Sequence, residues 1–182
     1  LADRGEPPAM VVPLPLDKAR RHSDYLDLRP LAAQVGSRVL EAPQVNAPEI
    51  MAEIRAAAPD YLFVVGWSQL VEPDVLAIAT RGTIGYHPAP LPELRGRAVI
   101  PWTILLGRNS TGSSLFWMDE GIDSGDILAQ RTFDVRPDET AASLIAKHVA
   151  NLEHLLGEIL PALARGDAPS MPQANGRATY CA

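Results

Sequence analysis

The segment that most constrains the fold is Asp60–Trp67, with the sequence DYLFVVGW. Its nearly continuous apolar run is typical of a strand that is covered on both faces. Helical segments are predicted on both sides of this strand. One follows Pro48, where Ile50 and Ile54 have the spacing of one helix face, and a short one covers Pro73–Ala79. Strands that alternate with helices predict an α/β sheet with parallel strand pairs.

The same alternation continues along most of the chain. Further helices are predicted over Asp27–Val35, after an N-cap at Asn46, over Val99–Leu106, and after a cap at Asp138, the last one kinked or ended by Pro161. Further strands are predicted over Met10–Leu14, Arg38–Leu40, Thr83–His87 and the stretches SSLFWM and DILAQRTFDV. The last two are close enough in sequence to pair antiparallel. Together these elements predict a Rossmann-like, open, mostly parallel twisted sheet with helices on both faces.

The two ends of the sequence carry less regular patterns. The chain starts at Leu1 rather than Met, and its first residues, LADRG, are typical of the end of a helix, so the first strand of the sheet is expected to precede them. The prolines and glycine after about residue 165 predict an irregular C-terminal tail over 165–182. No repeat, linker or low-complexity block interrupts the sequence, and a single domain over residues 1–182 is predicted.

Composition argues against several classes of protein. A net charge of −6 disfavours a general nucleic-acid surface, which needs a basic face. No apolar run reaches the roughly 18 residues of a membrane span, and no signal-peptide pattern is present. The single cysteine, Cys181, excludes an internal disulfide, and the four histidines lack the spacing of metal ligands. We therefore expect a cytoplasmic chain without a metal site that binds small molecules rather than nucleic acid or membrane.

Two polar residues stand at the carboxyl ends of predicted strands, where open α/β sheets bind ligands. His87 ends one strand, and Asp123 follows another within MDEGIDSGD. A lone histidine is more often structural, and a loop aspartate often only forms a turn. As a pair, however, the aspartate orients the imidazole and favours its charged form, so the two are suited to take a proton from an attacking amine. No serine nucleophile motif occurs and Cys181 lies in the tail, which favours direct group transfer between two bound substrates.

Two sequence blocks around these residues resemble a known family. The first is HPAPLP from His87, followed by Arg95-Gly96 and then Trp102, and the second is TGSSLFWMDEGIDSGDILAQ, which contains Asp123. They resemble the His-Pro-Ser-Leu-Leu-Pro…Arg-Gly signature and the catalytic aspartate block of the folate-dependent formyltransferases, in the same order and with a similar gap. The resemblance covers roughly residues 10–180 and implies 10-formyltetrahydrofolate as the formyl donor.

The resemblance also implies a role for each matching position. His87 is the expected catalytic histidine, and Asp123 is the aspartate that assists it. The expected walls of the 10-formyltetrahydrofolate pocket are two loops that hold Gln69, Leu70, Val71, Met118, Asp119, Glu120, Gly121 and Ile122. The expected acceptor contacts are Pro88, Arg95 and Arg97, since a guanidinium suits a diphosphate. The alternatives are core packing for the apolar residues and plain loop or surface positions for Gly121, Glu120 and the arginines.

One catalytic position departs from the family. A catalytic asparagine stands two residues before the histidine in the resembled signature, and this chain has Gly85 there. Losing one such oxyanion donor typically costs about 10²–10³ in rate. Either another donor, such as protonated His87 or a water, takes its place, or the site is weakened, altered or inactive.

The form of the motifs favours one acceptor class. The RGRA sequence, Trp102 and RATYC are similar to the branch that formylates amino sugars on nucleotide carriers. Glycinamide ribonucleotide or another small amine is the alternative acceptor. A catalytically impaired ligand-binding homologue and a deformylating hydrolase are the alternative functions. The family resemblance also allows a homodimer.

Overall fold

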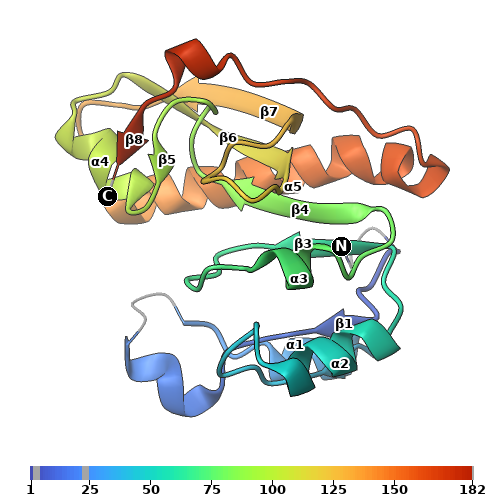
Figure 1. Cartoon of the computed structure of the whole chain (residues 1–182). Helices are drawn as coiled ribbons and strands as arrows, with labels where there is room; N and C mark the ends of the chain where they lie inside the picture. Colours follow the sequence, from blue (N-terminus) through green and yellow to red (C-terminus); the bar gives the residue numbers. More distant parts are fainter. Residues whose placement is uncertain (2–4, 22–24, 182) are drawn as a thin grey trace. The chain divides into compact units, whose positions relative to one another are not determined.

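Short strands and helices alternate along the computed structural model of the chain, which describes residues 1, 5–21 and 25–181 (Figure 1). This alternation confirms the predicted α/β class. The residues form two compact units, one made of Leu1–Asp60 and Ser68–Arg81 and the other of Tyr61–Trp67 and Gly82–Ala182. Among the described residues, none of the helices has both the length and the apolar character needed to cross a membrane.

The first unit holds a short parallel strand pair and several helices. β1 (Met10–Val11) pairs with β2 (Arg38–Val39). The helical segments are η2 (Leu16–Arg21), α1 (Arg29–Gln34), α2 (Pro48–Ala56) and α3 (Pro73–Leu76). α2 buries Ile50 and Ile54, which lie four residues apart and therefore on one face of the helix.

The second unit is built on a four-stranded mixed sheet. Its strands are β3 (Tyr61–Val64), β4 (Gly82–His87), β6 (Ser110–Trp117) and β7 (Ile127–Asp134), in the order β3-β4-β6-β7. β3 and β4 are parallel, whereas β4 pairs antiparallel with β6, and β6 with β7. The predicted antiparallel pairing of the last two strands is therefore confirmed. β3 lies at the edge of this sheet, and its residues are half-buried rather than fully covered.

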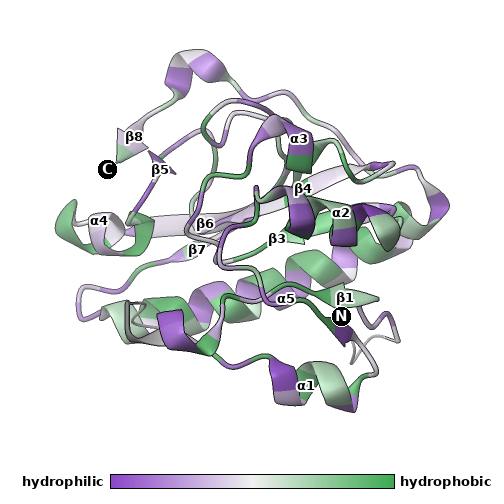
Figure 2. Cartoon of the chain, turned by 60° about the horizontal axis from the view of Figure 1, so that its bottom comes forward, coloured by the Kyte–Doolittle hydropathy of each residue, from purple (hydrophilic) through white to green (hydrophobic). Residues whose placement is uncertain are grey.

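One long helix, α5 (Ala141–Arg165), packs against β6 and β7 (Figure 1). The predicted cap at Asp138 is wrong, because Thr140 caps the helix and its side chain accepts a hydrogen bond from the Ser143 N–H. The predicted break at Pro161 is also wrong, since the helix continues for another turn. Its buried positions Leu155, Ile159 and Leu163 keep a spacing of four residues across the proline, so packing on the sheet outweighs the lost hydrogen bond. Figure 2 shows hydrophobic and hydrophilic residues alternating along α5, as expected of a helix with one buried face.

The segment after Arg165 has little regular structure, but it is tied to the sheet unit at several points. β8 (Tyr180–Cys181) pairs in parallel with β5 (Arg95–Gly96), and a short η3 (Asn175–Arg177) precedes it. Met171 exchanges two backbone hydrogen bonds with Ile127 at the start of β7. The predicted irregular tail is thus correct in most of its backbone but misses these attachments. α4 (Val99–Leu105) follows β5, with Pro101 in its first turn, where the missing N–H is tolerated.

Candidate active site

His87 lies at the carboxyl end of β4, where only 4% of its surface is exposed. Its Nε2 atom lies 2.7 Å from the backbone oxygen of Leu94, in the loop that follows the strand. A carbonyl oxygen can only accept a hydrogen bond, so Nε2 must carry the hydrogen. In the neutral ring the free lone pair is therefore on Nδ1, and Nδ1 is the nitrogen that can receive a proton.

Asp123 faces that nitrogen, as the sequence predicts. Its Oδ2 atom lies 3.5 Å from His87 Nδ1 and accepts a hydrogen bond of 2.8 Å from the Gly96 N–H. Asp123 has a φ of 49°, a left-handed conformation that costs a non-glycine residue about 1 kcal/mol or more. A carboxylate beside Nδ1 stabilises a proton that arrives there, so this arrangement is chemically suited to accept a proton.

Gly85 lies opposite Phe116 in the β4–β6 register, two residues before His87 on the same strand face. A Cβ atom built on Gly85 would lie only 2.6 Å from Phe116 Cε1 and 3.0 Å from Met118 Cγ. Phe116 is 3% exposed, so its ring has little room to move. The space beside position 85 is therefore filled by an aromatic ring, and the site has no polar side chain there.

The loop expected to bind the cofactor in the sheet unit begins at Met118, whose N–H donates to the Thr83 oxygen. Asp119 folds the loop on itself, because its Oδ1 accepts hydrogen bonds from the Gly121 N–H and the Ser124 hydroxyl. Glu120 and Gly121 are exposed, and Ile122 is 62% exposed. Exposed apolar side chains of this kind fit the wall of a site for a flat, partly apolar ligand.

The other expected cofactor loop, Gln69–Val71, belongs to the first unit. The Gln69 side chain accepts from the Val45 N–H and donates to the Pro43 oxygen, so both its polar atoms are engaged in holding the loop. Asn46 was expected to cap α2, but Ala47 is the cap residue. The Asn46 side chain instead donates to the Leu70 oxygen and accepts from the Glu72 N–H.

Leu70 itself is 78% exposed, whereas Val71 is buried. Within this loop, only Leu70 therefore offers a large free apolar surface. The polar atoms of Gln69 are already hydrogen-bonded and Val71 is buried. Backbone groups and the Leu70 side chain are therefore the parts of the loop that can contact a ligand.

The three expected acceptor contacts lie in different surroundings. Pro88 is half-buried directly after His87, and Arg97 is exposed. Arg95, in contrast, is 3% exposed and donates hydrogen bonds to side chains of the C-terminal segment. Its partners are Gln173 at 3.2 and 2.6 Å, Asn175 at 2.6 Å and the Tyr180 hydroxyl at 3.1 Å. These bonds direct the Arg95 guanidinium into the protein, so of the two arginines Arg97 is the one placed to meet a ligand from solvent.

A second buried histidine, His148 of α5, lies on the opposite face of the sheet. Tyr86 and Ser113 point to this face, since they alternate with His87 and Ser114 along their strands. His148 Nδ1 lies 2.9 Å from Ser113 Oγ, and the Tyr86 hydroxyl donates to the His148 backbone oxygen at 3.2 Å. His148 Nε2 is buried without a hydrogen-bond partner among the described residues. Burial, with a smaller contribution from His87, lowers the pKa of His148 to about 4.

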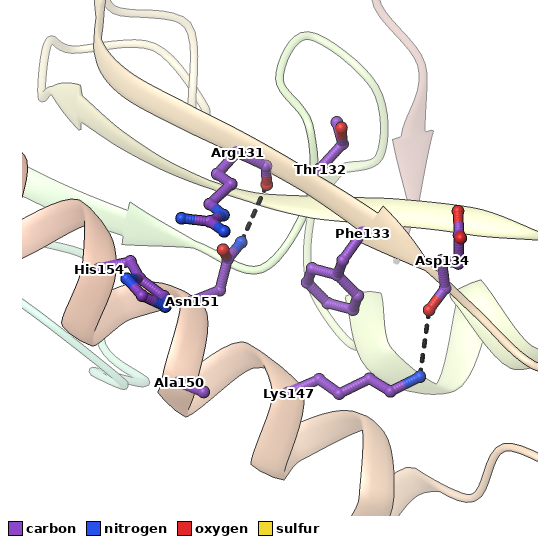
Figure 3. A pocket seen from close by; sticks show the side chains of 8 residues that line it. All are labelled: Arg131, Thr132, Phe133, Asp134, Lys147, Ala150, Asn151 and His154. Carbon is purple, nitrogen blue, oxygen red and sulfur yellow. Dashed lines mark hydrogen bonds between the residues drawn. The ribbon is translucent and has the colours of Figure 1, made fainter.

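A hollow of about 280 Å³ opens on this α5 face (Figure 3). It is lined by Arg131, Thr132, Phe133, Asp134, Lys147, Ala150, Asn151 and His154. The Asn151 side chain donates to the Arg131 oxygen, and Lys147 donates to the Asp134 oxygen and pairs with Glu139. None of the expected site residues lines it, so it is separate from the His87 site. Among the described residues, no cluster of three potential metal ligands occurs anywhere.

These features define an α/β protein in which a buried histidine at the end of a central strand faces a half-buried aspartate. A family model described as formyl transferase matches residues 10–162. The methionyl-tRNA formyltransferase of Myxococcus xanthus is 38% identical over 80% of this chain and 47% of its own length. That of Citrifermentans bemidjiense is 34% identical over the whole chain and 57% of its own length. The chain therefore belongs to the formyl transferase family, and it spans about half the length of the curated relatives it matches.

Solved structures share the fold at lower identity. Glycinamide ribonucleotide transformylase 1 from Symbiobacterium toebii superposes with a TM-score of 0.73, at 18% identity over 89% of this chain and 93% of that one. The formyltransferase PseJ from Anoxybacillus kamchatkensis gives 0.69, at 20% identity over 94% of this chain and 84% of that one. That structure contains UDP-4,6-dideoxy-4-formamido-L-AltNAc and tetrahydrofolate. The predicted formyltransferase-type fold is confirmed.

Proposed function

We propose that the protein transfers a formyl group from 10-formyltetrahydrofolate to a primary amine. The observation that carries this proposal is the His87–Asp123 pair, in which Nδ1 of a buried imidazole faces a carboxylate at 3.5 Å. Membership of the formyl transferase family supports the formyl group as the unit transferred. The exposed apolar side chain of Ile122 supports binding of the folate ring system by the loop that carries it.

In the proposed reaction, the acceptor nitrogen attacks the formyl carbon and forms the new carbon–nitrogen bond. The amine proton moves to His87 Nδ1, because Nε2 already holds a hydrogen that is donated to Leu94. Asp123 stabilises the resulting imidazolium. The Nδ1 proton then moves to the leaving nitrogen of tetrahydrofolate as the bond between that nitrogen and the formyl carbon breaks. Protons and bonds balance without a covalent enzyme intermediate.

The negative charge that develops on the formyl oxygen must be stabilised by a group other than residue 85. Phe116 occupies the space beside Gly85, so this position supplies no side-chain hydrogen bond. The protonated His87 is the group we propose for this role, through its positive charge, because its Nε2–H is donated to Leu94 and its Nδ1 faces Asp123. We expect a slower reaction than one assisted by a separate donor.

The first acceptor class to test is the amino group of an aminoacyl-tRNA, because the relatives at 34–38% identity are methionyl-tRNA formyltransferases. The acidic composition that disfavoured nucleic acid does not decide the matter, since the match to those relatives covers only 47–57% of their length. A nucleotide-linked amino sugar is the second candidate. The exposed Arg97 favours it, because a guanidinium in solvent can bind a diphosphate, whereas Arg95 is engaged within the protein.

The test is a formylation assay with the full-length protein and 10-formyltetrahydrofolate. Methionyl-tRNA, a nucleotide-linked amino sugar and glycinamide ribonucleotide are offered separately, and tetrahydrofolate release and the mass of the product are measured. We expect one acceptor to be formylated and the His87→Gln variant to lose the activity. No formylated product from any acceptor, together with no calorimetric binding of 5-formyltetrahydrofolate at millimolar concentration by the folded protein, would contradict the proposal.

A further inference from the structure

The C-terminal segment runs along the loop that carries Asp123 and touches it at successive positions. The Trp117 indole N–H donates to the Pro169 oxygen at 2.9 Å, and the Ser170 hydroxyl donates to Asp126 Oδ2 at 2.7 Å. Met171 and Ile127 exchange backbone hydrogen bonds of 2.8 and 3.0 Å. This segment lies beyond residue 162, where the match to the family model ends.

Gln173 makes the contact nearest to the proposed chemistry. Its Nε2 atom donates to the backbone oxygens of Asp123 at 2.9 Å and Gly125 at 2.6 Å. Both hydrogens of the amide are therefore used on the loop, and Gln173 is 8% exposed. These bonds fix the peptide that follows Asp123, the residue held at a φ of 49°. A left-handed non-glycine residue persists only where its surroundings impose it, and Gln173 supplies that constraint.

Arg95 fixes the other end of the same amide. Its guanidinium donates to Gln173 Oε1 from both Nε and Nη2, so the amide cannot rotate to exchange its oxygen and nitrogen. Asn175 Oδ1 and the Tyr180 hydroxyl accept two further hydrogen bonds from Arg95. The adjacent Gly96 N–H donates to Asp123 Oδ2, so the carboxylate and the backbone of Asp123 are held by one connected network.

We propose that Gln173 is a positioning residue, which holds the Asp123 carboxylate at His87 by fixing the backbone of its loop. This inference rests on the proposed formyl transfer for its catalytic consequence. It assigns the C-terminal segment a part in the reaction, through Asp123 rather than through contact with the substrates. The buried Arg95 then serves as an anchor for Gln173 and not as a phosphate-binding group.

The substitution Gln173→Glu separates the two ends of the amide. A glutamate still accepts from Arg95, and with added charge, but it offers no hydrogen to the oxygens of Asp123 and Gly125. Gln173→Met removes both interactions at similar volume. Asn175→Ala is the matched control, because Asn175 accepts from Arg95 and has no bond to the loop. Asp123→Asn is the reference for loss of the carboxylate charge.

We expect Gln173→Glu and Gln173→Met to lower kcat by about 10- to 100-fold, since a small displacement of a catalytic group has effects of this size. The acid limb of the kcat–pH profile should move in the same direction as in Asp123→Asn. Amide hydrogen exchange over residues 119–126 should become faster in both variants. Asn175→Ala should keep the wild-type kcat, pH profile and exchange.

Wild-type kcat, pH profile and exchange in both Gln173 variants would overturn the inference. Unfolding of both variants would also overturn it, because Gln173 would then hold the fold rather than the loop. An inactive wild-type protein would refute the proposed function separately. In that case faster exchange over 119–126 in the Gln173 variants alone still supports the holding of the loop, and unchanged exchange refutes it.

Discussion

The two faces of the four-stranded sheet each bury a histidine, and the two histidines are under opposite constraints. His87 and His148 are 4% and 3% exposed. Both nitrogens of His87 face oxygen atoms, one of them the Asp123 carboxylate, whereas His148 Nε2 meets no partner among the described residues. The two rings therefore differ in their partners and not in their exposure. One imidazole faces a carboxylate, whereas burial, with a smaller contribution from His87, lowers the pKa of the other.

The largest effect should come from removing the charge beside His87. Asp123→Asn preserves the size of the side chain but removes the carboxylate that stabilises a proton on Nδ1, so we expect kcat to fall by about 100-fold or more. Rapid-quench formylation assays measure this change. Asp126→Asn is the control from the same loop, because Asp126 bonds Ser170 and not His87. Equal losses in the two variants would show that loop structure, rather than the charge at His87, was disturbed.

The next effect concerns the Phe116 ring, which fills the space beside Gly85 where the family signature has an asparagine side chain. Gly85→Asn should lower the free energy of unfolding by about 1–3 kcal/mol, because its Cβ overlaps the buried Phe116 ring. Urea unfolding measures this, and the Phe116→Ala background provides the control. In the Phe116→Ala background, Gly85→Asn should lower the free energy of unfolding by less. The kcat of this double variant should exceed that of Phe116→Ala alone, because the side-chain amide of the introduced asparagine supplies a hydrogen-bond donor. An equal cost in both backgrounds would contradict the overlap.

The opposite face should respond to pH through stability rather than through rate. The pKa of His148 is about 4 in the folded protein and near 6.5 when unfolded, so between these values the unfolded state binds more protons. Stability should therefore be full above pH 6.5 and decrease as the pH falls towards 4, by about 3 kcal/mol. Urea unfolding across this range tests it. His148→Gln should remove this dependence of the free energy of unfolding on pH. His154→Gln, at an exposed position of the same helix, should leave the dependence unchanged.

The smallest effect should come from the start of the helix that covers this face. Thr140 caps α5 by accepting from the Ser143 N–H, and Thr140→Ala should cost about 1 kcal/mol of stability. The kcat of formyl transfer should stay at the wild-type value, because the cap lies on the side of the sheet that holds His148. Thermal unfolding together with the formylation assay checks both statements. A lower kcat in Thr140→Ala would contradict the independence of the two faces of the sheet.

The placement of His87 beside Asp123 follows from sequence signals that are local. His87 ends a regular strand, and Asp123 lies in a loop with glycines and a serine, so their positions follow from neighbouring residues. The residues that cap or end helices are harder to predict from the sequence. Asn46 has the chemistry of a cap but bonds a distant loop, and Pro161 has the chemistry of a break but lies on a helix that the sheet holds together.

The burial of Arg95 could not be predicted from the sequence, because it depends on residues that are distant along the chain. Nothing near it in the sequence indicates that its guanidinium is buried, since its partners follow 78 to 85 residues later. The same holds for Phe116, whose contact with Gly85 depends on strand register, and for Gln173. Interactions of long sequence separation carry no local pattern, and they determine which of the candidate residues face a ligand.

The attachment of the C-terminal segment has a consequence for synthesis of the protein. Gln173, which closes the Asp123 loop, is translated 50 residues after it. At bacterial or eukaryotic elongation rates of about 5–20 residues per second, the nascent chain therefore carries His87 and Asp123 for several seconds before their geometry can be fixed. Until residue 173 has been synthesised, the loop that carries Asp123 lacks both hydrogen bonds from the Gln173 amide.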